Sequence, residues 1–214
     1  MRHKKEERTW AKFSPYNKMF GEHEKYKILL SISLLDLLIE KEYEEITSDL
    51  IIEKAKFTKE NYIWMADDKV SLLKTYFEIA NDEIIIEANK DFKEDISATV
   101  NEKLTDIIIR FFEFHEKHKL SIKKIYRCNL SNSNFLSLFI YIISDLSKKA
   151  LKISGGQSFT FNDNLILIGL TSTYSMIFHK WVIAQNKDIS NIMNVADKYL
   201  NNAEEIASNL KIIN

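Results

Sequence analysis

Apolar side chains recur along most of this chain at steps of three and four residues, the spacing that places them on one face of an α-helix. This pattern predicts helices over approximately 22–41, 47–55, 58–65, 67–88, 92–117, 119–129, 135–153, 161–185 and 189–210. No stretch alternates between apolar and polar residues as a half-buried β-strand would. The sequence therefore predicts an all-α fold of about nine helices joined by short polar links.

The stretch from Glu44 to Phe77 organises the rest of the chain. Thr47 can cap the first of its two short helices, because its hydroxyl can accept a hydrogen bond from a free N–H group of the first turn. Thr58 is a second capping residue, and the pair Lys56-Phe57 between the helices predicts a tight turn. Two short helices joined in this way indicate a helix-turn-helix, whose second helix enters the DNA major groove.

Composition and charge narrow the classes of function. The chain has 214 residues, of which 45% are hydrophobic and only 4 are Gly and 1 is Pro, so a sizeable core is expected but few tight turns. A net charge of -1 excludes a uniformly basic nucleic-acid binder. Residues 1–27 nevertheless carry 8 Lys and Arg against 4 Glu. A basic N-terminal arm over 1–21 can contact phosphates or the minor groove, and a solvated tail without a partner is the alternative.

Cysteine usage and hydropathy predict the cellular compartment of the protein. Cys128 is the single cysteine and cannot form an internal disulfide, which favours an intracellular protein. No apolar run approaches the roughly 20 residues that span a bilayer, and residues 1–10 do not have the pattern of a signal peptide. We therefore expect a cytoplasmic protein with no membrane span.

Candidate catalytic and metal-binding residues are few. His115 and His118 lie three residues apart with Glu113 and Glu116 beside them, and this spacing can place metal ligands on one helix face. No third group of ligands accompanies them, so the polar run HEKHK predicts a solvated helix end and no metal site. The sequence has no Ser-His-Asp order, paired carboxylate site or phosphate-binding glycine loop. We predict a protein that is not an enzyme and carries no cofactor.

The predicted helices over 161–185 and 189–210 are apolar over more of their circumference than a surface helix would be. We expect this pair to form a four-helix interface with the same pair from a second copy, as a two-fold homodimer. The candidate dimer-interface residues are Ile177, Trp181, Ile192 and Tyr199. A ligand pocket in such a bundle would be apolar with a few polar groups. The candidate pocket residues, each of a type that is also common in cores, are Phe111, Phe112, Phe139, Tyr141, Tyr174 and Phe178.

From Ile28 to Phe77 the chain resembles the TetR family of one-component transcriptional regulators. The patterns that carry the resemblance are T-x-x-x-I-x-x-x-A, at Thr47, Ile51 and Ala55, and K-x-x-L-L, at Lys69, Leu72 and Leu73. The resemblance implies a helix-turn-helix domain over 22–66 that binds a double-stranded DNA operator as a homodimer. It also implies a helical ligand-binding and dimerisation domain over 67–214, where a small hydrophobic effector would bind and release the operator. The DNA contacts that it implies are Thr47, Thr58, Lys59, Asn61, Tyr62, Trp64 and Lys69.

The sequence departs from that family at the turn and in the second short helix. Lys56 stands where the turn usually has glycine. Ile63, Met65 and Ala66 replace the usual aromatic and His-Phe residues of the recognition helix. Its apolar positions and caps therefore match the family more closely than its DNA-contact positions do.

A second resemblance supplies an alternative function. The lipid-binding helper proteins of ubiquinone biosynthesis share the TetR fold but do not bind DNA. The residues similar to their C-terminal segment are Gly155, Gln157, Ser158, Phe161, Asn162, Tyr174 and Asp188. The acidic and aromatic residues of their loop motif are absent from this chain. The alternative is thus a TetR-fold protein that binds a lipid or small molecule without DNA, and a protein-interaction module is a third reading.

Overall fold

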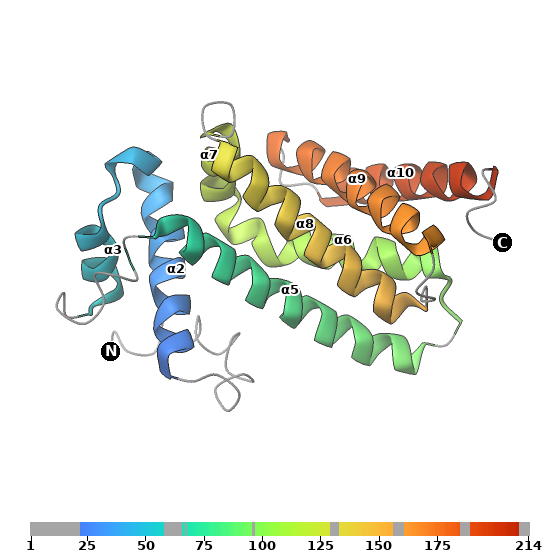
Figure 1. Cartoon of the computed structure of the whole chain (residues 1–214), viewed down its shortest axis with the longest axis horizontal. Coiled ribbons are helices and arrows are strands. Elements are labelled where there is room, and N and C mark those ends of the chain that lie inside the picture. The colour runs from blue at the N-terminus through green and yellow to red at the C-terminus, as the bar shows by residue number, and fades with distance from the viewer. Residues whose placement is uncertain are drawn as a thin grey trace.

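A computed structural model of the chain describes residues 22–57, 66, 68–95, 97–128, 133–155, 161–184 and 189–209. The α-helices are α2 (Glu22–Glu40), α3 (Ser48–Ala55), α5 (Lys69–Glu94), α6 (Val100–His115), α7 (Lys119–Cys128), α8 (Ser133–Ser154), α9 (Phe161–Ile183) and α10 (Ile189–Asn209). Two short 3-10 helices lie between them, η2 (Tyr43–Glu45) and η3 (Glu116–His118). The described residues contain no β-strand, which confirms the all-α fold (Figure 1).

The long helices form a bundle, and α2 and α3 lie together at one end of it (Figure 1). α5 starts beside α2 at that end and runs along the bundle, packing against α2, α6 and α8. α9 packs between α8 and α10, and α10 also packs against α6. α7 packs against α2, so α5 and α7 both join the small end to the bundle.

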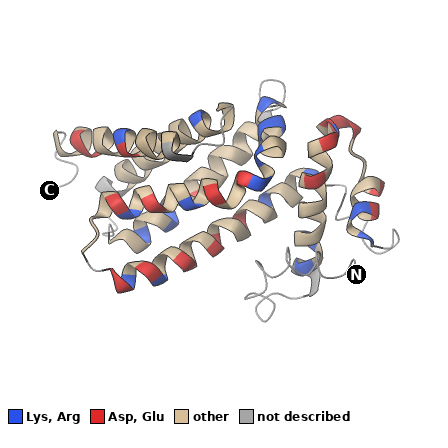
Figure 2. Cartoon of the chain, turned by 180° about the vertical axis from the view of Figure 1, so that it is seen from behind, with Lys and Arg blue, Asp and Glu red and all other residues tan. Residues whose placement is uncertain are grey.

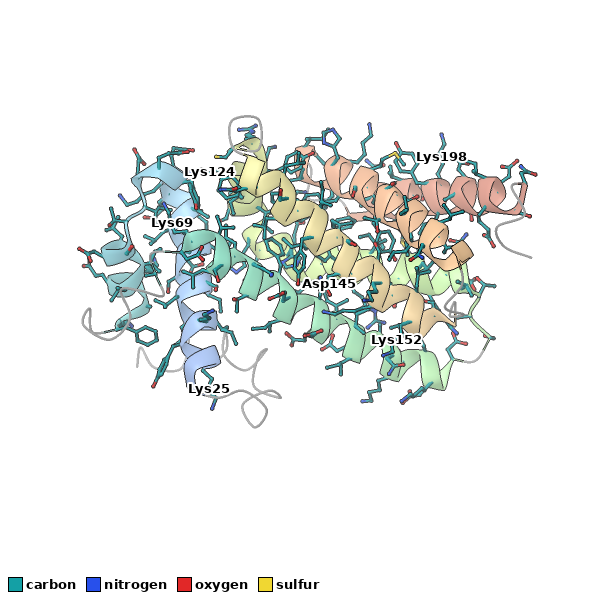
Figure 3. All side chains as sticks on the ribbon, viewed as in Figure 1. Lys25, Lys69, Lys124, Asp145, Lys152 and Lys198 are labelled. Carbon is teal, nitrogen blue, oxygen red and sulfur yellow. The ribbon has the colours of Figure 1, made fainter. Side chains whose placement is uncertain are left out.

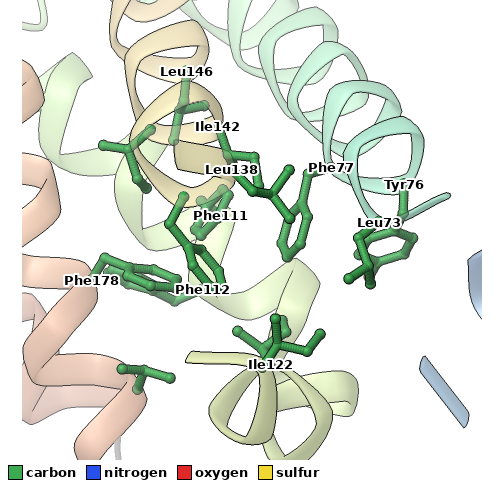
Figure 4. Close-up of a cluster of buried hydrophobic side chains, with 14 of the residues drawn as sticks. Leu73, Tyr76, Phe77, Phe111, Phe112, Ile122, Leu138, Ile142, Leu146 and Phe178 are labelled. Carbon is green, nitrogen blue, oxygen red and sulfur yellow. The ribbon is translucent and has the colours of Figure 1, made fainter. Parts of the chain in front are cut away.

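One continuous hydrophobic cluster extends from α2 into the bundle. Its centre is aromatic, and Figure 4 shows Phe77 of α5, Phe111 and Phe112 of α6 and Phe178 of α9 converging there. Phe112 stacks on Trp181 with 5.0 Å between the ring centroids. Ring pairs of this kind each contribute about 0.5–1.5 kcal/mol beyond the burial of their surface. A displacement of one ring in this core therefore shifts side chains on several helices at once.

The observed helix ends differ most from the sequence prediction between α5 and α6. α5 continues to Glu94, and α6 begins at Val100 instead of near residue 92. A capping box sets this start, because the Thr99 hydroxyl accepts a hydrogen bond from the Glu102 N–H and the Glu102 carboxylate accepts one from the Thr99 N–H. Phe92, whose apolar side chain extends the periodic pattern, belongs to the end of α5.

Candidate functional site

α3 and the turn that follows it form the first half of the helix-turn-helix. The Thr47 hydroxyl accepts a hydrogen bond from the Leu50 N–H at 3.4 Å, so Thr47 is the N-cap that the sequence predicts. The helix ends at Lys56, whose φ of 61° and ψ of 36° place it in the left-handed region. The Phe57 N–H then donates to the Ile52 carbonyl at 3.0 Å. This geometry turns the chain sharply after Ala55, and a non-glycine residue in it costs about 1–2 kcal/mol.

Aromatic packing holds the turn against α2. The rings of Tyr26 and Phe57 meet edge to face, with 5.3 Å between their centroids. Ile51 and Ile52 are buried on the inner face of α3, which packs against α2. The angle between α2 and α3 is therefore fixed by side chains on both sides of the turn.

The second half of the motif falls largely outside the described residues. The basic arm over 1–21 lies outside them as well. So do the residues of this half that are expected to contact DNA, which are Thr58, Lys59, Asn61, Tyr62 and Trp64. Ala66, which is buried, and Asp68 mark where the described chain resumes. The Asp68 carboxylate accepts a hydrogen bond from the Ser71 N–H at 2.9 Å and so caps α5.

Lys69, expected to be a DNA contact, has its ammonium group engaged by the protein. It donates to the carbonyl oxygens of Tyr43 and Ile46, both at 2.9 Å, and lies 4.0 Å from the centre of the Tyr43 ring. Burial lowers the pKa of Lys69, and the charge of Glu44 partly opposes that effect. Thr47, the other expected contact among the described residues, is exposed at the start of α3.

The described surface of the helix-turn-helix is acidic. η2 and α3 together with the residues that flank them carry five carboxylates and two ammonium groups: Glu42, Glu44, Glu45, Asp49, Glu53, Lys54 and Lys56. In Figure 2 the ribbon around η2 has the colour of acidic residues. Lys124 of α7 offsets part of this charge, because its ammonium group lies 3.1 Å from the Glu42 carboxylate. DNA phosphates would be repelled by the remainder.

The arrangement of helices matches a solved structure. A crystal structure of a TetR transcriptional regulator from Rhodococcus sp. RHA1 superposes with a TM-score of 0.60, covering 85% of this chain and 97% of that chain at 14% sequence identity. The chain has a TetR-like fold. No protein-family model matches the sequence, and no curated protein matches it either. At this level of identity the superposition shows the fold alone.

Most of the candidate pocket residues lie in the aromatic core of that fold. Phe111, Phe112, Phe139 and Phe178 are buried, and Phe139 and Phe178 have 5.3 Å between their ring centroids. Tyr174 is also buried, and its hydroxyl donates to the Leu104 carbonyl at 2.6 Å. Tyr141 lies apart from this cluster, on the surface, where its hydroxyl donates to the Glu78 carboxylate.

The end of α6 is buried, although the sequence predicts a solvated helix end there. His115 is fully buried, and His118 is 5% exposed. The Tyr76 hydroxyl and His115 Nδ1 are 3.1 Å apart, while neither ring nitrogen of His118 has a hydrogen-bond partner. Burial, the nearby ring of His118 and the charge of Lys117 hold the pKa of His115 well below its ordinary value. Among the described residues, no three His, Cys, Asp or Glu side chains are grouped to hold a metal ion.

The periodic pattern contained a signal for this burial. Counting along α6, Leu104, Ile108, Phe111 and His115 lie at steps of three and four residues on one face. His115 therefore extends the buried face of α6, and the polar residues beside it lie on the other face.

The residues expected at a dimer interface are largely inside the protomer. Ile177, Trp181 and Ile192 are buried, and the Trp181 indole N–H donates to Glu116 at 3.2 Å, so these three side chains belong to the protomer's own core. Tyr199 is half-buried. The exposed apolar side chains of the same two helices, between 38% and 62% exposed, are Leu165, Ile168, Met176, Ile183, Met193 and Ile206.

Among the described residues, one helical segment passes a length and hydropathy test for a membrane span, Asn164–Ile183 in α9. In the structure 39% of its most apolar window is buried, and α9 packs against α8 and α10. Core helices of bundles pass the same test, so length and composition alone do not assign α9 to a membrane.

Proposed function

We propose that this protein is a homodimeric, TetR-like DNA-binding transcriptional regulator that responds to a small hydrophobic ligand. The observation that carries the proposal is the capped α3 with its left-handed turn at Lys56, followed by the capped start of α5 at Asp68. The interval between them has room for one short recognition helix, as a helix-turn-helix requires. Such a regulator acts in the cytoplasm and has no catalytic step.

A second copy would supply the second half-site. Helix-turn-helix dimers read half-sites about 34–36 Å apart, which requires a two-fold interface. Ile168, Met176 and Ile183 lie along the exposed side of α9 at steps of seven and eight residues, so they form one line on the helix. A dimer would bury this line of exposed apolar side chains against the same line of a second copy.

The ligand would bind among the aromatic rings of the bundle. Phe111, Phe112, Phe139 and Phe178 already pack together, so a ligand has to displace at least one of these rings. Because α8 carries Phe139 and packs against α5, displacement of this ring would be passed to the helix that leads to the helix-turn-helix. Such a ligand would release the operator because it changes the position of α3.

Electrophoretic mobility shift with DNA from upstream of its own gene tests the proposal. A shift is expected at low salt and should weaken steeply as salt rises, because bound Lys and Arg release counterions from phosphates. Lys59→Ala should weaken binding on all sequences and reduce the salt dependence by about two counterions, one for each copy in the dimer. Lys198→Ala, on the exposed side of α10, is the matched control. No binding at low salt would reject the DNA-binding function.

The acidic surface over η2 and α3 favours a second candidate, a protein of TetR-like fold that binds a lipid or small molecule and has no DNA target. Native mass spectrometry of the purified protein would then detect a hydrophobic molecule that co-purifies with it. A ligand-free protein that shifts DNA would exclude this candidate. A ligand-bound protein that fails to shift DNA, both before and after extraction of the ligand, would favour it.

A further inference from the structure

Tyr43, the first residue of η2, touches two elements outside the helix-turn-helix. Its ring meets the ring of Phe135 in α8 edge to face, with 4.8 Å between centroids and 90° between planes. The Lys69 ammonium of α5 lies 4.0 Å from the centre of the same ring. Phe135 is buried and Tyr43 is half-buried. The Tyr43 ring therefore lies where α8, α5 and the segment leading into α3 meet.

Lys69 fixes the backbone of that segment. The carbonyl oxygens of Tyr43 and Ile46 each accept a hydrogen bond from its ammonium group at 2.9 Å (Figure 3 labels Lys69 beside α2 and α3). Carbonyl groups at the end of a helical turn carry partial negative charge, which suits an ammonium partner. Ile46 directly precedes Thr47, the N-cap of α3. A displacement of η2 is therefore passed to the start of α3 across a single peptide bond.

α8 connects this contact to the aromatic core. Phe135 precedes Phe139 by four residues, so both side chains lie on the same face of α8. Phe139 packs against Phe178, at 5.3 Å, and against Phe77, at 6.2 Å between ring centroids. Because the core is close-packed, a molecule that displaces Phe139 also moves the helix that carries Phe135.

We propose that Tyr43, Lys69 and Phe135 form a coupling joint through which a displacement of α8 changes the position of α3. The coupling passes through the side-chain contact between α8 and η2 and not only along α5. All three are positioning residues, and none of them has to touch DNA. The effect on operator binding rests on the proposed function, whereas the joint itself can be tested without DNA.

Hydrogen exchange of the full chain, without DNA or ligand, tests the joint. Phe135→Leu removes the edge contact from α8, and Tyr43→Leu removes it from η2, so either variant provides the test if the other does not fold. Tyr43→Phe keeps the ring and should retain wild-type exchange. Leu170→Ala is the control, because this side chain is buried in the same hydrophobic cluster but comes from α9 and is not one of the proposed ligand-binding rings. Exchange of the α3 amides is expressed relative to that of the α6 amides, which report the opening of the bundle.

Either joint variant is expected to accelerate exchange in α3 about 2- to 10-fold relative to α6, the range that corresponds to one aromatic edge contact. The double variant should be no faster than the faster single variant, because both remove the same contact. Equal acceleration by Leu170→Ala, or unchanged exchange in both joint variants, would overturn the proposal.

Mobility shift of the wild-type chain separates the two proposals. If α3 responds to Phe135→Leu but the wild-type protein binds no DNA, the regulator function fails and the joint stands. If the wild-type protein binds DNA and α3 does not respond, the joint alone is overturned.

Discussion

Acidification should weaken the fold through His118. The ring is buried in η3 beside the ring of Tyr76, and its Nδ1 lies 3.9 Å from the Asp36 carboxylate of α2. Burial, with a smaller effect of the charge of Lys117, lowers the pKa of His118 from 6.5 to about 4. As the pH falls below 6.5, the unfolded chain binds a proton at His118 that the folded protein does not bind until about pH 4. Stability is therefore lost across that window.

The magnitude follows from the difference between the two pKa values of His118. The free energy of unfolding should fall by about 2 kcal/mol between neutral pH and pH 5, and by about 3 kcal/mol at pH 4. His115 acts in the same direction, because its pKa is held well below its ordinary value. Asp36 acts in the opposite direction, since burial raises its pKa and the folded chain takes up that proton more readily. Asp36 is partly exposed, so its contribution is screened by solvent.

Urea unfolding followed by circular dichroism, repeated between neutral pH and about pH 4.5, measures this loss. His118→Leu removes the titrating ring without breaking a hydrogen bond, because neither ring nitrogen has a partner. The variant should lose about 2 kcal/mol less than the wild type across the window. Met193→Leu, at an exposed position that does not titrate, is the control and should keep the wild-type loss. Parallel losses in the wild type and in His118→Leu would refute the assignment to His118.

Three further tests concern the turn at Lys56, the cap at Thr47 and the exposed side of α9. Lys56→Gly should raise the free energy of unfolding by about 1 kcal/mol, because glycine adopts the left-handed conformation without a Cβ clash, and Lys56→Val should lower it in the same urea titration. Thr47→Ala should cost about 1 kcal/mol through the lost cap, whereas Thr47→Ser should not. Met176→Lys should convert a dimer to a monomer in light scattering, whereas Ile86→Lys, at a similarly exposed position of α5, should leave the mass unchanged. A monomeric wild type would contradict the dimer.

The first half of the predicted helix-turn-helix, α3 and the turn after it, was predictable because its local signals agree with its packing. Thr47 caps α3 in the structure as its position in the sequence predicts, and Lys56 adopts the conformation that the missing glycine would have adopted. The sequence also contains the signal for the start of α6, because Thr99 is followed three residues later by Glu102. The apolar Phe92 carries the periodic pattern across this boundary, so periodicity alone places the start too early.

The exposed side of α9 was not predictable for a different reason. Apolar residues surround this helix, so periodicity cannot tell the side that packs on α8 and α10 from the side that faces outward. Trp181, a predicted interface residue, is buried, whereas Met176 on the same helix is exposed. Tertiary packing decides between the two sides, and the sequence of one protomer does not contain that information locally.

Charge limits the ways in which this helix-turn-helix can hold DNA. Carboxylates dominate η2 and α3, and within a Debye length of about 8 Å their repulsion of phosphates is only partly screened. If the protein binds DNA, the attraction has to come from Lys59, in the predicted second short helix, or from the predicted basic arm over 1–21. The logarithm of affinity falls with the logarithm of salt by about 0.9 for each phosphate neutralised. For a homodimer, which carries two copies of Lys59, a slope near −2 would assign binding to the predicted recognition helix alone, whereas a slope steeper than about −4 would require the arm. The salt dependence thus identifies the binding element as well as the activity.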